Sequence, residues 1–117
     1  MNKKTLKALN GSIQHWEQII EGSEDENGIH NCSLCIFFYY RLGNYKFCEG
    51  CPVEEKTGKS NCYGSPYWKW FKIFQSDADF DENLPRKWQN LSKKFQKKAI
   101  LAAEAELKFL KSLLPKD

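Results

Sequence analysis

The amino-acid sequence predicts a mainly α-helical single domain over residues 1–117, in which two terminal helices pack on a small, turn-rich, four-cysteine module of knuckle or ribbon type. Two observations lead to this prediction. Apolar residues recur at steps of three and four along both ends of the chain, which is the period of an amphipathic helix. Between these ends, residues 31–64 contain all five cysteines and four of the seven glycines. A length of 117 residues is that of one ordinary domain.

The N-terminal helix is predicted over residues 1–22. Its apolar stripe consists of Leu6, Leu9, Ile13, Trp16 and Ile20. The tripeptide NGS at 10–12 interrupts the pattern, so Ser12, a good N-cap residue, is an alternative start. Gly22 is expected to end the helix. The acidic stretch that follows has no apolar period and is expected to be a solvated loop.

Two more helices are predicted after the cysteines. A short helix over 65–76 is indicated by Ser65 as a candidate N-cap and by Pro66 at the first helical position. A second acidic loop at 77–82, also expected to be solvated, follows, and then a long C-terminal helix over 84–115. The apolar stripe of this last helix consists of Trp88, Leu91, Phe95, Ala99, Ala103, Leu107, Leu110 and Leu114. This helix is long for a small domain, so part of it could pair with a second copy of the chain. The sequence is therefore compatible with a monomer and with a homodimer formed through this helix.

The cysteine spacing, C-x2-C-x12-C-x2-C-x10-C, predicts a structural Zn²⁺ site. Two C-x-x-C pairs separated by a short spacer are typical of tetrahedral zinc, which binds four thiolates. The predicted ligands are Cys32, Cys35, Cys48 and Cys51. Cys62 and His30 are alternative ligands. Four thiolates leave no open position for water, so the site is expected to stabilise the fold rather than to catalyse a reaction.

Other uses of these thiols are weaker alternatives. The run C-x-x-C-P resembles iron–sulfur cluster motifs, but the third closely spaced cysteine is missing. A thioredoxin-like redox pair would need a βαβ unit, and the sequence shows none. An enzyme that uses Cys62 or an iron–sulfur cluster is therefore the third hypothesis for function.

Two segments are candidate binding surfaces. The stretch RKWQNLSKKFQKK at 86–98 contains no acid and offers cations for a nucleic-acid backbone, namely Arg86, Lys87, Lys93, Lys94, Lys97 and Lys98. Its Trp88 and Phe95 lie on the apolar stripe and are expected in the core. The aromatic run at 66–74 offers a protein-binding surface at Tyr67, Trp68 and Trp70. Because Trp68 and Trp70 are two residues apart, at least one of them is expected to be partly exposed.

Charge and hydrophobicity indicate which partners and which cellular compartment to expect. The net charge of +3 does not by itself indicate a nucleic-acid partner. No stretch approaches the roughly 18 consecutive apolar residues of a membrane-spanning helix, so no membrane partner is expected. The N-terminus carries lysines without the apolar segment of a secretory signal. We therefore expect a cytoplasmic protein, in which structural disulfides are rare.

The strings NCSLCIFF, CEGCPVEEKTG and CYGSPYWKW together resemble small cysteine-rich proteins of tailed bacteriophages. The segments SIQHWEQII and AEAELKFLKSLLP fit the same resemblance, which thus covers most of the chain. It implies an origin in a phage or prophage and action in a bacterial cytoplasm, and it carries over no activity. It also implies that Cys62 belongs to the motif, either as a metal ligand or packed beside the metal.

These observations favour a zinc-stabilised binding protein that acts on a bacterial host protein or protein–nucleic-acid complex. Inhibition of a host defence nuclease, as an anti-CRISPR protein would do, is a special case suggested by size and by the phage resemblance. The alternative is a zinc-ribbon-like protein that binds nucleic acid through the basic face of 86–98. A closed metal site points to binding because it shapes a surface without supplying a reactive position.

Overall fold

The computed structural model describes residues 1–26, 33–35, 37–38, 51–58 and 65–115. Their elements are α1 (Lys3–Glu21), α2 (Ser33–Cys35), α3 (Pro52–Thr57), α4 (Tyr67–Ser76), the 3-10 helix η3 (Trp88–Asn90) and α5 (Lys93–Ser112). Every regular element in these ranges is helical, which confirms the predicted mainly helical class with its N-terminal and long C-terminal helices. The four-cysteine module stays a prediction, because most of its residues lie outside these ranges.

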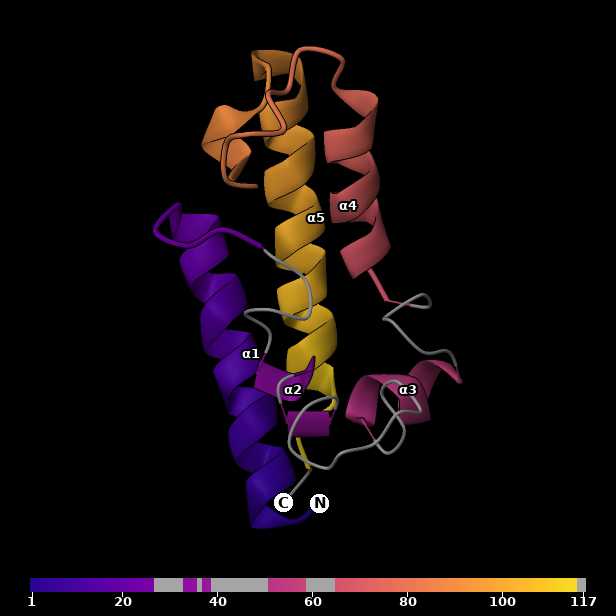
Figure 1. The fold of residues 1–117 in the computed structure, drawn as a ribbon. Coiled ribbons are helices and arrows are strands. Elements are labelled where there is room, and N and C mark those ends of the chain that lie inside the picture. The colour runs from indigo at the N-terminus through magenta and orange to yellow at the C-terminus, as the bar shows by residue number, and fades with distance from the viewer. Residues whose placement is uncertain (27–32, 36, 39–50, 59–64, 116–117) are drawn as a thin grey trace.

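Helix α5 is the central element. It lies between α1 and α4, and it runs antiparallel to α1, so that α1 begins and α5 ends at the same end of the molecule (Figure 1). The short α2 packs on α1. The buried core contains residues from all five α-helices and from the segment between η3 and α5. The first and last parts of the sequence therefore hold the cysteine-containing region against one common core.

Helix α1 is continuous from Lys3, so the alternative start at Ser12 is wrong. The side chain of Asn2 caps the helix by accepting a 2.8 Å hydrogen bond from the Thr5 N–H. Gly22 ends it, as predicted, with a left-handed φ of 90° and an N–H that bonds the Gln18 carbonyl. Buried residues extend from Thr5 to Ile19. Packing along this whole face outweighs the low helix propensity of the NGS tripeptide.

The core is centred on two tryptophans. Trp70 of α4 is fully buried, and its ring meets that of Trp16 of α1 edge to face, with centroids 5.6 Å apart. Phe74, one turn further along α4, packs on Trp70 at 4.9 Å. Helix α4 ends at Ser76, as predicted, but it begins at Tyr67 with Pro66 at the N-cap position, one residue later than predicted for the cap. Ser65 accepts a hydrogen bond from the Tyr67 N–H at 3.3 Å.

Helix α5 begins at Lys93, so the prediction of one helix over 84–115 is wrong at its start. The chain forms η3 at Trp88–Asn90 and is extended at Leu91 and Ser92. The reason is a long-range hydrogen bond. The carboxylate of Asp77 accepts the Ser92 N–H at 2.7 Å and the Ser92 hydroxyl at 2.8 Å. These bonds hold Ser92 at φ −57° and ψ 147°, outside the helical region.

Asp77 also overturns the expectation that the second acidic loop is wholly solvated. Its side chain is buried, and it accepts a further hydrogen bond from the Asp79 N–H at 3.1 Å. The bond from the Ser92 N–H lowers the pKa of the Asp77 carboxyl, and this outweighs the opposite effect of burial. The bonds to the Ser92 hydroxyl and the Asp79 N–H, and the charge of Lys94, act in the same downward direction.

Asp77→Asn should destabilise the protein and weaken its acid sensitivity. An amide presents a donor where the carboxylate accepts two hydrogen bonds from Ser92. Because the folded pKa of Asp77 is depressed, its stabilisation is present above the ordinary aspartate value of 3.8 and is lost as pH falls through the folded pKa. Urea unfolding between about pH 6 and pH 2 should show a lower midpoint and a smaller acid decline in the variant. The matched control, Asp79→Asn, should behave like the wild type, and equal effects of both variants would contradict this assignment.

Trp70→Ala should cost about 3–5 kcal/mol of unfolding free energy, because it opens a large cavity in the core. Trp70→Phe should cost clearly less. The indole N–H of Trp70 makes no hydrogen bond within the described part of the chain, so phenylalanine loses packing but no polar partner. Equal losses in the two variants, measured by urea unfolding, would show that the N–H matters.

Candidate functional site

Two of the four predicted zinc ligands lie in the described residues. Cys35 is the last residue of α2, and Cys51 directly precedes α3. The Cys51 side chain is buried, and its carbonyl accepts the Glu55 N–H at 2.9 Å in the first turn of α3. Cys32 and Cys48, as well as the alternative ligands Cys62 and His30, lie outside the described residues. Among the residues that are described, no group of three or more His, Cys, Asp or Glu side chains is placed to hold a metal ion.

The segment that carries Cys35 is seated directly on α1. The Ser12 hydroxyl, which is buried, accepts the Leu34 N–H at 3.2 Å. Gly11 lies so close to α2 that a β-carbon there would be 2.5 Å from the Ser33 oxygen and 2.9 Å from its β-carbon. The NGS tripeptide, which interrupts the amphipathic pattern, is therefore the contact that fixes α2 on α1.

The cysteine-containing region also contributes apolar side chains to the common core. Leu34 and Phe38, close to Cys35, are buried, and so are Cys51 and Val53. Pro52 occupies the first position of α3, where its missing N–H costs nothing. Hydrophobic packing therefore helps to place the chain on both sides of the predicted metal site.

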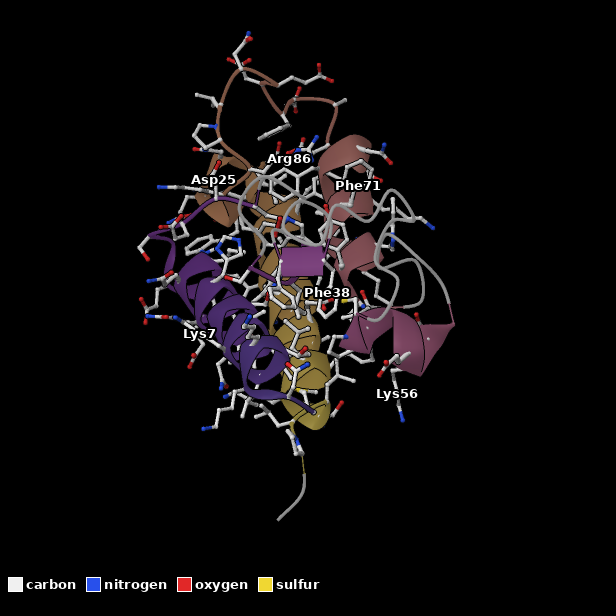
Figure 2. The ribbon with its side chains drawn as sticks, turned by 60° about the horizontal axis from the view of Figure 1, so that its bottom comes forward. Lys7, Asp25, Phe38, Lys56, Phe71 and Arg86 are labelled. Atoms are coloured by element: carbon white, nitrogen blue, oxygen red, sulfur yellow. The ribbon has the colours of Figure 1, made fainter. Side chains whose placement is uncertain are left out.

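The outward side of α4 carries an aromatic surface, which we define as Tyr67, Trp68, Phe71 and Arg86. The three rings are half-buried and in mutual contact: Trp68 meets Phe71 at 5.1 Å and Tyr67 at 5.7 Å, both edge to face. The Arg86 guanidinium lies 5.0 Å from the centroid of the Phe71 ring, as a cation–π pair (Figure 2). Tyr67 and Trp68 thus lie where a partner can reach them.

Trp70 does not belong to this surface. It has no exposed area, so the partner-binding role predicted for it is wrong. The helical step explains the division: residues at two positions apart point about 200° apart around a helix axis, and Trp70 faces α1 and α5. The expectation that Trp68 or Trp70 would be partly exposed is confirmed by Trp68.

The cations predicted at 86–98 do not all belong to one helix face. Lys93, Lys94, Lys97 and Lys98 are exposed on the first two turns of α5, whereas Arg86 stacks on Phe71 of α4 and Lys87 is half-buried. The interleaved aromatics pack inward, as expected. Trp88 donates its indole N–H to the Ile20 carbonyl at 3.0 Å, and Phe95 lies against the core beneath Lys94 and Lys98.

One polar pair was missed by sequence reasoning. His15 and Glu26 are both buried, and the His15 Nε2 lies 3.5 Å from a Glu26 carboxylate oxygen. Glu26 also donates its backbone N–H to the Arg86 carbonyl at 3.2 Å. The loop at 24–26 is therefore not wholly solvated, because Glu26 ties it to α1 and to the chain before η3. No local signal distinguishes Glu26 from Glu24 and Asp25 beside it, which are only half-buried.

Comparison with family models, with curated proteins and with solved structures finds no match. Within the described ranges, no helix has both the length and the apolar character that crossing a membrane requires.

Gly11→Ala should destabilise the protein, although alanine is the better helix former. The propensity gain is about 1 kcal/mol, whereas overpacking costs about 1–3 kcal/mol. The Ser33 hydroxyl can rotate away from the new methyl group, but the Ser33 β-carbon moves only with the backbone of α2. We expect a net loss on the order of 1 kcal/mol in urea unfolding. Asn10→Ala, on the exposed side of the same turn, should be neutral or slightly stabilising, and a Gly11→Ala variant as stable as wild type would disprove the close contact.

Proposed function

We propose that this chain is a zinc-stabilised binding protein of phage type that acts by docking on a protein of a bacterial host. The aromatic surface of α4 is the observation that carries the proposal. Tryptophan, tyrosine and arginine are the residues that most often dominate protein–protein binding energy. Here one of each lies on a single surface, and Phe71 joins them.

The aromatic surface adjoins the core through Tyr67, whose ring meets that of Trp16 edge to face at 6.2 Å, but the centre of the core is filled by other residues. Trp16, Trp70 and Phe74 already occupy the space between α1, α4 and α5, and each is at most 5% exposed. Tyr67, Trp68 and Phe71 lie at the margin of that core with half of their area accessible or less. Rings that contact one another and a stacked guanidinium lose little conformational freedom when a partner binds, and this favours tight association.

The predicted zinc site supports the proposal because zinc binding would stabilise the folded scaffold. The predicted ligand Cys51 is buried among core residues, and the segment of Cys35 is held by Ser12, so both points of the chain are already fixed by packing. If Cys32, Cys35, Cys48 and Cys51 bind zinc, the ion supplies a closed tetrahedral link between the two C-x-x-C pairs. Such a link stabilises the scaffold on which the aromatic surface is presented.

The host protein is proposed to be part of a defence complex, in particular a nuclease. This part of the proposal is supported by the phage resemblance and the small size of the chain. An enzyme that acts through Cys62 or an iron–sulfur cluster is the weaker alternative. Zinc in the purified protein would favour the binding protein, and iron would favour the cluster.

The proposal predicts that Trp68 dominates binding to the partner. The tagged chain would be expressed in a bacterium, cross-linked, and its stoichiometric partner identified by mass spectrometry and then purified. Trp68→Ala should weaken the measured Kd at least about 30-fold, the loss expected for a hot-spot residue worth 2 kcal/mol or more. Gln75→Ala, an exposed substitution on the same helix, should bind like the wild type.

The same experiment decides against the proposal in two cases. Equal affinities of the Trp68→Ala and Gln75→Ala variants would remove the aromatic surface from the interface. Absence of any stoichiometric partner across several bacterial hosts would count against a protein-binding function. Thermal melts of both variants, matched to the wild type within a few degrees, confirm that each variant is folded.

A further inference from the structure

The outward face of α5 carries a row of lysines. Helix α5 buries one side between α1 and α4, with Ala99, Ala103 and Leu110 at its centre. At 3.6 residues per turn, the opposite side presents six exposed lysines. We define the lysine face as Lys93, Lys94, Lys97, Lys98, Lys108 and Lys111. Its length along the helix is on the order of 27 Å.

The acids of α5 do not balance the positive charge of the lysine face, and outside α5 the Asp77 carboxylate lies close enough to Lys94 to interact with its charge. Glu104 is the one exposed acid of α5, because Glu106 is buried. Within the described part of the chain, no ion pair joins any of the six lysines to a carboxylate. Lys93 and Lys97, one turn apart, repel each other, and Lys93 and Lys94 stand at the positive end of the helix dipole. The Asp77 carboxylate, which accepts the Ser92 N–H, offsets part of this repulsion at the start of α5, and an external polyanion would offset more of it.

The other side chains on the lysine face indicate which kind of polyanion it fits. A membrane surface would require large apolar side chains among the lysines, and Leu101 is the one exposed large apolar residue of α5. Single-stranded nucleic acid would require accessible aromatic rings for stacking. The Phe95 ring is instead covered by the ammonium groups of Lys94 and Lys98, at 5.1 and 5.7 Å. The lysines form two groups on one side of the helix, at 93–98 and at 108–111, with Leu101 and Glu104 exposed between them. Two groups of cations without aromatic platforms fit the phosphates of a duplex better than the bases of a single strand.

We propose that the lysine face of α5 binds the phosphate backbone of double-stranded nucleic acid without sequence preference. This site is independent of the aromatic surface of α4. It differs from the basic face expected from residues 86–98, because Arg86 lies with the aromatic surface and Lys108 and Lys111 extend the row along the helix. Lysines act as point charges on phosphates and do not read base edges.

The test is fluorescence anisotropy of the full chain with a labelled 20-base-pair duplex of arbitrary sequence, across a salt series. If several lysines contact phosphates, log K should fall with log salt with a slope between about −3 and −5. Lys93→Gln combined with Lys97→Gln should weaken binding roughly tenfold at low salt and reduce the slope by about 2. The control, Lys69→Gln combined with Lys72→Gln, removes the same charge from exposed positions on α4 and should leave the affinity within about twofold of wild type.

Each of four other results would overturn the proposal. No duplex binding at low salt would remove the site, and equal losses in both double variants would reduce it to an effect of net charge. Tighter binding to a single strand of the same length would exclude the duplex as the preferred ligand. Binding to vesicles that contain anionic lipid, without binding to the duplex, would assign the face to membranes.

Discussion

Helices α1 and α4 can both pack on α5 because α5 presents small side chains to them. Ala99 and Ala103 are fully buried and Ala102 is nearly so, which lets two neighbouring helices approach closely. The large aromatic rings come from the neighbours: Trp16 from α1, and Trp70 with Phe74 from α4. The large rings of the neighbours thus fill the space beside the small side chains of α5. The seat of α2 on α1, the loop fixed by Asp77 and both exposed surfaces are arranged around this packing.

Local patterns were sufficient to predict the elements whose limits are set by local interactions. The end of α1 follows from Gly22, and the bounds of α4 follow, to within one residue, from Ser65, Pro66 and the aromatic period. The start of α5 did not follow from its pattern. The apolar stripe continues back through Trp88, yet the Asp77 carboxylate holds Ser92 extended across 15 residues of sequence. A single aspartate in an acidic loop gives no sign of such a bond.

The candidate sites, too, could be predicted from the sequence only in part. Spacing alone predicted the cysteine ligands, and alternation around a helix predicted that one of Trp68 and Trp70 is exposed. Which tryptophan is exposed depends on the side of α4 that faces α5, and this is a tertiary property. Similarly, the basic segment 86–98 reads as one unit in the sequence. The structure divides it, because Arg86 stacks on Phe71 while the lysines of α5 face outward.

The proposed function rests on a metal ion that joins the two cysteine pairs, and native mass spectrometry with elemental analysis tests this most directly. The full chain would be purified without added metal, together with Cys62→Ser. We predict one zinc ion per chain in both proteins, because the proposed ligands are Cys32, Cys35, Cys48 and Cys51 and do not include Cys62. A folded chain without metal, or a chain that contains iron, would contradict this prediction.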